Sequence, residues 1–160
     1  DEESLAQRFL SKARGVSKGV SVGGISNAMI AFAKCCNPIP GDEIVGYITK
    51  GRGVSVHRST CSNIPVLESE NRFIDVEWNV SSESAFVVRL NISAIDRKHL
   101  LKDVSEKVSS MNIYIQSIDM RANDGLASCV LVVQIRDTKQ LERLFRALKQ
   151  LNHVVSVERI

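Results

Sequence analysis

Hydrophobic and polar residues alternate in the second half of the chain with the periods expected of strands and helices. Apolar residues occupy every second position of a first run, at Phe86, Val88, Leu90, Ile92 and Ala94. This period of two is typical of a strand with one buried face. Asp96 then precedes a run with helical spacing and is a candidate helix cap. The apolar positions of that predicted helix are Leu100, Leu101, Val104, Val108 and Met111.

The same reading continues to the end of the chain. A strand is predicted at 113–121, where the apolar phase shifts between Ile115 and Ile118 and indicates a bulge. Asn-Asp-Gly at 123–125 predicts a hairpin turn into a third strand at 126–135. Asp137 or Thr138 caps a second helix, and a last strand follows at 154–160. The apolar positions of the second helix are Leu141, Leu144, Phe145, Leu148 and Leu151. The order β-α-β-β-α-β predicts a ferredoxin-like module.

The third predicted strand has apolar residues on both of its faces. Val130 and Val132 alternate with Cys129, Leu131 and Val133. A sheet with one solvated face alternates more cleanly, so we expect both faces of this strand to be covered and the open sheet face to contact a partner. Cys129, in the middle of the strand, is interpreted as a buried core thiol.

The first half has a different pattern of short strands and turns. EIVGYIT and GVSVH predict two strands joined by the tight link 50–52, and FIDVEW predicts a third. Residues 27–34 are compatible with helix or strand. The predicted organisation is α+β: a helical remnant or linker at 1–20, a small β-rich domain at 21–78, a Ser-rich linker at 79–84 and a ferredoxin-like domain at 85–160.

Composition and charge narrow the class of protein. The chain has 160 residues, of which 44% are hydrophobic. It shows neither a signal peptide nor a membrane-length apolar run, so we expect a cytoplasmic protein without membrane contact. It starts with Asp1, as expected of part of a longer protein. The net charge of +3 lies in residues 1–65, which hold eight basic and five acidic residues. The same half contains a short basic cluster of Lys50, Arg52 and Arg58. Such a cluster is either a solvated face or an RNA contact.

The candidate chemistry lies in the same half. Cys35, Cys36, His57 and Cys61 are the kinds of ligand that suit zinc, and four of them would form a closed, structural site. Adjacent cysteines on a strand point to opposite faces, so both reach one ion only at a turn, for which Asn37-Pro38 supplies a break. The alternative is that these cysteines are small buried hydrophobic residues.

The motif CC-x-P-x-PGDEIVGYIT-x-GRG-x-SVHR-x-x-C, followed by a β-α-β-β-α-β module, resembles the C-terminal regulatory end of long RelA/SpoT stringent-response proteins. The resemblance covers roughly residues 20–160 and implies a zinc-finger (ribosome-intersubunit) domain followed by an ACT domain. It places the metal ligands on Cys35, Cys36, His57 and Cys61, and rRNA contacts on Lys50, Arg52 and Arg58. The implied parent makes or hydrolyses (p)ppGpp with upstream catalytic domains, so the present chain is not expected to be an enzyme. The implied partners are large-subunit rRNA and deacylated tRNA on the ribosome.

One position departs from the pattern of amino-acid-binding ACT domains. These usually carry Asp-x-x-Gly-Leu-Leu at the first strand–helix junction, where this chain has Asp96, His99, Leu100 and Leu101. The imidazole of His99 would occupy the space that glycine leaves for a ligand, which argues against a small-molecule site there. The alternative is that His99 is simply a polar residue in the first turn of the helix. Two alternative functions stay open. One is an amino-acid-sensing ACT homodimer, and the other is an autoinhibitory module that packs on the parent's catalytic domains without RNA contact.

Overall fold

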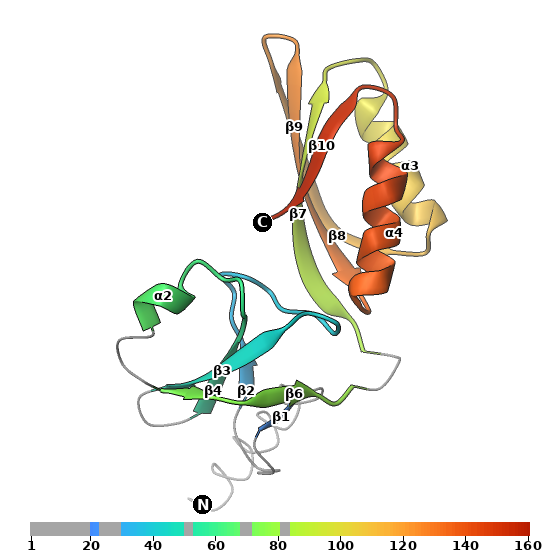
Figure 1. Cartoon of the computed structure of the whole chain (residues 1–160). Helices are drawn as coiled ribbons and strands as arrows, with labels where there is room; N and C mark the ends of the chain where they lie inside the picture. Colours follow the sequence, from blue (N-terminus) through green and yellow to red (C-terminus); the bar gives the residue numbers. More distant parts are fainter. Residues whose placement is uncertain (1–19, 23–29, 50–52, 68–71, 81–83) are drawn as a thin grey trace, which may run out of the picture. The chain divides into compact units, whose positions relative to one another are not determined.

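The computed structural model of the chain describes residues 20–22, 30–49, 53–67, 72–80 and 84–160 (Figure 1). Two compact units divide the chain, Asp1–Ser84 and Ala85–Ile160. The helical remnant expected at 1–20 lies outside the described residues apart from Val20, and so do 81–83 of the expected linker. None of the helices in the described part combines the length and the apolar character needed to cross a bilayer.

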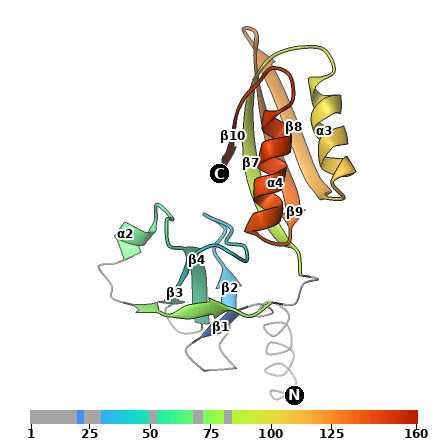
Figure 2. The ribbon, with the colours of Figure 1, turned by 45° about the vertical axis from the view of Figure 1, so that its right-hand side comes forward.

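Unit 2 is a four-stranded antiparallel sheet with two helices. Its strands are β7 (Phe86–Ile95), β8 (Tyr114–Asn123), β9 (Leu126–Ile135) and β10 (Val154–Arg159), and its helices are α3 (Leu100–Ser110) and α4 (Thr138–Lys149). The strand order is β10-β7-β9-β8. Both helices cover the same face of the sheet (Figures 1 and 2). This confirms the ferredoxin-like β-α-β-β-α-β arrangement.

Local sequence signals explain most element boundaries of unit 2. The Asp137 carboxylate accepts a 2.8 Å hydrogen bond from the Gln140 N–H and caps α4. Asp124 and Gly125 both have positive φ, 52° and 77°, as a two-residue hairpin turn between twisted strands requires. The β8–β9 register shifts between Ile115 and Ser117, which confirms the predicted bulge.

Helices and sheet of unit 2 enclose one aliphatic core. Its fully buried members come from two central strands and both helices: Val88, Leu90, Ile92, Leu131, Val133, Ile135, Val104, Val108, Leu144 and Leu148. Cys129 is 1% exposed, so its interpretation as a core thiol is confirmed. Within unit 2 the helices cover one face of the sheet, while Val130 and Val132 lie half-buried on the other. A partner on that face stays a prediction.

Two predictions for α3 are wrong. Asp96 does not cap the helix, because α3 begins at Leu100 and the cap position belongs to His99, whose side chain makes no capping hydrogen bond. Leu101 does not face the core. A start at Leu100 brings Leu100, Val104 and Val108 onto the buried face at a spacing of four, and Leu101 lies 46% exposed.

Unit 1 consists of two small sheets. One contains β2 (Ile30–Phe32), β4 (Gly53–Arg58), β3 (Ile44–Thr49) and β5 (Phe73–Ile74), in the order β2-β4-β3-β5, and the other pairs β1 (Val20–Val22) with β6 (Val76–Trp78). Of the described residues in 27–34, Ile30–Phe32 form a strand. The β3–β4 hairpin is confirmed. FIDVEW is not one strand: β5 pairs with β3 and β6 with β1, so the chain changes sheets at Asp75.

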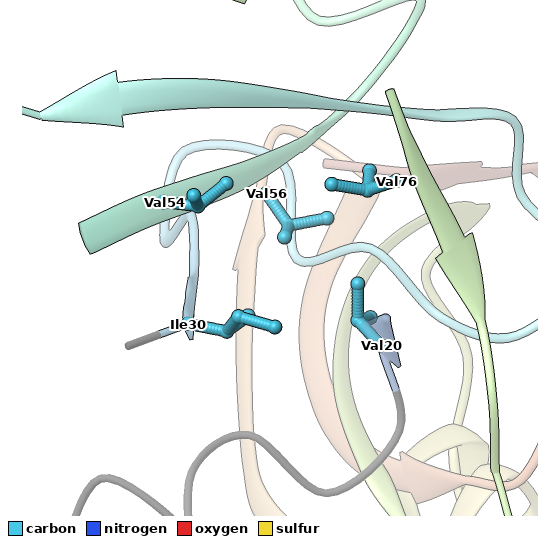
Figure 3. Close-up of a cluster of buried hydrophobic side chains, with 5 residues drawn as sticks. All are labelled: Val20, Ile30, Val54, Val56 and Val76. Atoms are coloured by element: carbon cyan, nitrogen blue, oxygen red, sulfur yellow. The ribbon is translucent and has the colours of Figure 1, made fainter. Parts of the chain in front are cut away.

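A cluster of buried hydrophobic residues lies between these sheets. Figure 3 shows its five residues, Val20, Ile30, Val54, Val56 and Val76. Val54 and Val56 alternate with Ser55 and His57 along β4, so this strand presents its valines to the core and its polar residues to the opposite face. Unit 1 also contains the short helix α2 (Ile64–Leu67), which begins three residues after Cys61.

Candidate metal centre

A turn after β2 brings the two adjacent cysteines together. The Asn37 N–H donates to the Ala33 carbonyl at 2.9 Å, which closes one helix-like turn around Cys35 and Cys36. Asn37 has a positive φ of 43°, a conformation that asparagine tolerates better than most residues. The chain is therefore not extended here, and the strand geometry that would separate adjacent side chains does not apply. Both sulfurs lie 4.0 Å apart.

The Pro-Gly-Asp segment that follows forms a second tight turn. The Asp42 N–H donates to the Ile39 carbonyl at 3.0 Å, and Gly41 has a φ of 100°. Pro40 and Gly41 thus occupy the two central positions of a turn that requires positive φ at the second. The Asp42 carboxylate accepts from the Ile39 N–H at 2.8 Å, and its carbonyl accepts from the Trp78 indole at 2.9 Å. Asp42 therefore joins this turn to the distant strand β6.

The remaining two candidate ligands come from β4 and the turn after it. His57 lies on β4 and is 7% exposed. The Cys61 N–H donates to the Arg58 carbonyl at 3.0 Å, and this turn leads the chain back toward the first two cysteines. Cys36 and Cys61 are buried, whereas Cys35 is exposed.

The structure brings all four predicted ligands together. The Cys35 sulfur lies 3.5 Å from Nδ1 of His57 and 3.6 Å from the Cys61 sulfur, and the Cys36 sulfur lies 3.9 Å from the same Nδ1. All four ligand atoms lie within 4.8 Å of one another. One ion can therefore contact all four.

Neighbouring groups orient two of these ligands. Ser55 Oγ lies 3.2 Å from Nε2 of His57, so a hydrogen bond there leaves Nδ1 free to face the sulfurs. The Arg58 backbone N–H donates to the Cys36 sulfur at 3.3 Å. Backbone N–H groups directed at sulfur stabilise a thiolate, the form in which cysteine binds metal.

Burial and hydrogen bonds shift the pKa values of Cys36, Cys35 and His57. Burial raises the pKa of the Cys36 thiol to about 12, against the opposing effect of the Arg58 N–H. For Cys35 burial also opposes ionisation, but hydrogen bonds with Asn63, Cys61 and Cys36 outweigh it and lower the pKa. Burial lowers the pKa of His57, which favours the neutral imidazole that ligates metals. Metal binding must therefore displace thiol protons.

Only one of the three predicted cationic residues, Arg58, lies in the described part of the chain. Thr49 pairs with Gly53 at one end of the β3–β4 hairpin, and Lys50 and Arg52 lie between them in the sequence, outside the described residues. Arg58 pairs with Ile44 at the other end, beside the cysteines. Its Nε lies 3.8 Å from the largely buried Asp42 carboxylate. Arg58 is thus tied into the metal-site turns and does not share a loop with the other two.

The candidate ACT ligand residues differ in exposure. Asp96 and His99 are exposed, Leu100 is buried at 2%, and Leu101 points away from the core. His99 has a φ of 65°, a conformation that favours glycine. Arg97 binds the junction internally, with a 2.7 Å ion pair to Asp103 and a 3.0 Å hydrogen bond to the Asn152 carbonyl. These contacts tie the start of α3 to the segment before β10.

An open groove of about 320 Å³ lies beside α3. Its lining does not include Asp96, His99, Leu100 or Leu101. An amino-acid site at the predicted strand–helix junction therefore stays a prediction.

Sequence reasoning missed three residues that position the metal ligands. Strand alternation alone would have identified Ser55, which is two residues before His57 and so on the same face. Asp42 belongs to the motif, but its link to Trp78 spans 36 residues and leaves no local signal. Arg58 was predicted to contact RNA because of its charge. The structure shows it bound to the turns around the metal ligands, through Cys36 and Asp42.

Comparisons with known proteins cover both units. Residues 20–79 match the family model of the RelA/SpoT RIS domain, and residues 82–159 match an ACT domain. Both are regulatory domains. A crystal structure of the ACT domain from the GTP pyrophosphokinase of Chlorobium tepidum covers 48% of this chain and 100% of that chain, with 25% identity and a TM-score of 0.45.

Curated relatives match over almost the whole chain. The GTP pyrophosphokinase of Myxococcus xanthus is 38% identical over 157 residues, which are 98% of this chain and 20% of that protein. The bifunctional (p)ppGpp synthase/hydrolase RelA of Mycobacterium tuberculosis is 37% identical over 144 residues, 89% of this chain and 20% of that protein. The chain thus spans about a fifth of the length of these relatives.

Proposed function

The chain belongs to the RelA/SpoT family, whose C-terminal regulatory region it matches, and we propose that it docks on ribosomal RNA and A-site deacylated tRNA and transmits starvation status to upstream catalytic domains. The observation that carries this proposal is the succession of a RIS and an ACT domain in one chain. The names of the relatives support synthesis or hydrolysis of (p)ppGpp as the activity of the parent protein.

We propose that the ion held by the cluster is zinc, with Cys35, Cys36, His57 and Cys61 as its ligands. Tetrahedral zinc has Zn–S distances of about 2.3 Å and Zn–N distances of about 2.0–2.1 Å, which require about 3.8 Å between sulfurs and about 3.5 Å between sulfur and nitrogen. The observed separations of 3.6 and 4.0 Å between sulfurs, and of 3.5 and 3.9 Å between sulfur and Nδ1, support this geometry.

A structural role for zinc follows from the donor set. Four protein ligands fill a tetrahedral shell and leave no position for water or substrate, unlike catalytic zinc sites. The ion would fix the turns after β2 and β4 to each other. Elemental analysis of chain purified without chelator tests this proposal, and a well-folded unit 1 without metal contradicts it.

Docking would use the cationic link between β3 and β4. Lys50 and Arg52 are separated by one glycine, and the surplus of basic residues lies wholly within 1–65. Lysine and arginine side chains bind phosphates without reading bases, so such a contact positions the protein on RNA and carries no sequence preference. Arg58 is a weaker candidate than the other two, because its guanidinium lies near Asp42.

The docking proposal is tested by the double variant Lys50→Ala/Arg52→Ala. We expect weaker binding to ribosomes that carry deacylated tRNA, with the salt slope reduced by about one unit for each lost phosphate contact. The metal content should not change, because neither residue is a ligand. A matched control is Lys139→Ala/Arg143→Ala, which removes the same charge from exposed positions on α4.

The control separates a local contact from general electrostatic attraction. If both double variants weaken binding equally, the net charge and not the link is responsible. If the Lys50→Ala/Arg52→Ala variant keeps the affinity and salt slope of the unsubstituted chain, the link is not the docking surface. The autoinhibitory function would then be favoured.

A further inference from the structure

The three sulfurs of the cluster differ in their access to solvent. Cys35 is exposed, whereas Cys36 and Cys61 are buried at 6% and 8%. A soluble oxidant therefore meets the Cys35 sulfur first, because thiol oxidation follows access as well as thiolate character. Metal coordination by four protein donors does not by itself require one ligand to be exposed, so this asymmetry is a separate property of the site.

The neighbours of the Cys35 sulfur decide which disulfide can follow. The Cys61 sulfur is the nearer one, at 3.6 Å, and the Cys36 sulfur lies at 4.0 Å. Consecutive Cα atoms are about 3.8 Å apart, below the range of about 4.4–6.8 Å that disulfides usually span. A bridge between Cys35 and its neighbour Cys36 would therefore strain the turn. The Cys36 sulfur also accepts the Arg58 N–H.

We propose that the cluster is an oxidation site for hydroperoxides, in which Cys35 is the attacking sulfur and Cys61 the resolving one. The proposal rests on the metal site proposed above. The Cys35 thiolate attacks the peroxide O–O bond, which breaks to give a sulfenic acid and one hydroxide or alkoxide. The Cys61 thiolate then attacks that sulfur, forms the S–S bond and expels a second hydroxide. Two electrons pass from the two sulfurs to the peroxide, and the metal itself is not oxidised.

Loss of two thiolates removes half of the metal's donors. Cys36 and His57 alone cannot hold zinc tightly, so disulfide formation releases the ion. The new bond joins the same two turns that the ion joined, since Cys35 follows β2 and Cys61 follows β4. Reduction of the disulfide regenerates both thiolates and allows the metal to rebind. The cluster would thus exchange a metal link for a covalent link under oxidising conditions.

Cys129 provides an internal reference for this chemistry. It lies in the core of unit 2, 1% exposed, on a sheet strand between buried aliphatic residues. A reaction governed by access should leave it as a free thiol while Cys35 is consumed.

The test uses the metal-loaded 160-residue chain treated with one equivalent of hydrogen peroxide. Three quantities are measured: zinc released to a colorimetric chelator, the cysteine that dimedone traps as sulfenic acid, and the disulfide found by non-reducing peptide mapping. In the presence of dimedone, we expect the label on Cys35. In its absence, we expect a Cys35–Cys61 disulfide and about one zinc ion released for each disulfide. Reduction of the disulfide should allow zinc to bind again. The variant Cys129→Ala should behave identically.

Three results would overturn the proposal. The first is that dimedone traps Cys36 or Cys129 before Cys35. The others are a Cys35–Cys36 disulfide and zinc that stays bound after Cys35 has been oxidised. Metal analysis before peroxide is added separates this test from that of the metal site. A metal-free chain contradicts the zinc proposal and the release step, whereas the mapped disulfide decides the oxidation pair in either case.

Discussion

The two units of this chain are built from similar amounts of sequence but are held together differently. Unit 2 has strands of six to ten residues, two amphipathic helices and a continuous aliphatic core. In its described part, unit 1 has strands of two to six residues and a hydrophobic cluster of five buried residues. Four metal-type ligands gather in the same unit. We infer from this difference that hydrophobic burial is sufficient for unit 2, whereas unit 1 relies on an additional link between its turns.

Loss of one metal ligand should unfold unit 1 and leave unit 2 folded. Cys36→Ser removes a buried metal ligand, and structural zinc contributes about 10–16 kcal/mol of apparent binding free energy to small domains. We therefore expect unit 1 to unfold and unit 2 to stay folded. Trp78 is the only tryptophan of the chain and lies in unit 1, stacked on Phe32 at 5.7 Å, so its fluorescence reports this unit alone.

Cys129→Ala is the matched control for that variant. It also removes one buried sulfur, but from the core of unit 2. It should leave the metal content and the Trp78 fluorescence unchanged. Loss of the Trp78 signal in both variants, or in neither, would show that the two units do not differ in the way proposed.

The second prediction concerns the close packing inside unit 1. A Cβ on Gly46 would lie 2.7 Å from Val76, 2.8 Å from Val54 and 2.9 Å from Ile74, so no side chain fits between the sheets. Gly46→Ala should destabilise unit 1 by about 1–3 kcal/mol through overpacking. Thermal unfolding followed by Trp78 fluorescence measures the shift.

Gly125 offers a control in open space. A Cβ on Gly125 would meet no described atom within 4 Å, and the φ of 77° at this position is one that asparagine tolerates. Gly125→Asn should leave the unfolding of unit 1 unchanged. A Gly46→Ala chain that unfolds at the same temperature as the unsubstituted chain would contradict the proposed tight contact between the sheets.

The smallest expected effect acts on the metal and not on the fold. Ser55→Ala removes the hydrogen bond to Nε2 of His57 and should weaken zinc binding about 10–100-fold, the usual cost of losing a group that orients a ligand. Ser55→Thr keeps the hydroxyl and should restore the affinity. Competition with a chelator of known affinity measures both, and NMR of the His57 ring nitrogens reports the tautomer. Equal affinities for the Ala and Thr variants would exclude a positioning role for Ser55.

The sequence predicted unit 2 more completely than unit 1 for a physical reason. Long strands and helices repeat their hydrophobic period often enough to be recognised, and the bulge near Ile115, the turn at Asp124-Gly125 and the Asp137 cap are local signals. The errors at Asp96 and Leu101 concern the start of α3. A different first residue of the helix changes which residue is the cap and which side chains of the first turn face the core.

In unit 1 the ligand residues were predictable and their support was not. Residue type and the family motif identified Cys35, Cys36, His57 and Cys61, and the structure brings them together. The break of FIDVEW into two strands depends on pairing with β1 and β3, which are distant in sequence. Two- and three-residue strands carry too little periodicity to be assigned from their own residues.

We infer that a metal cluster stabilises unit 1, whereas unit 2 is stable without it. Hydrogen–deuterium exchange of the whole chain, with zinc bound and after its removal by a chelator, distinguishes the units because each peptide reports its own unit. We predict that chelation abolishes protection along β3 and β4 and leaves the protection of β7 and β9 unchanged. Protection of β3 and β4 that survives metal removal, or a parallel loss in β7 and β9, would contradict the account.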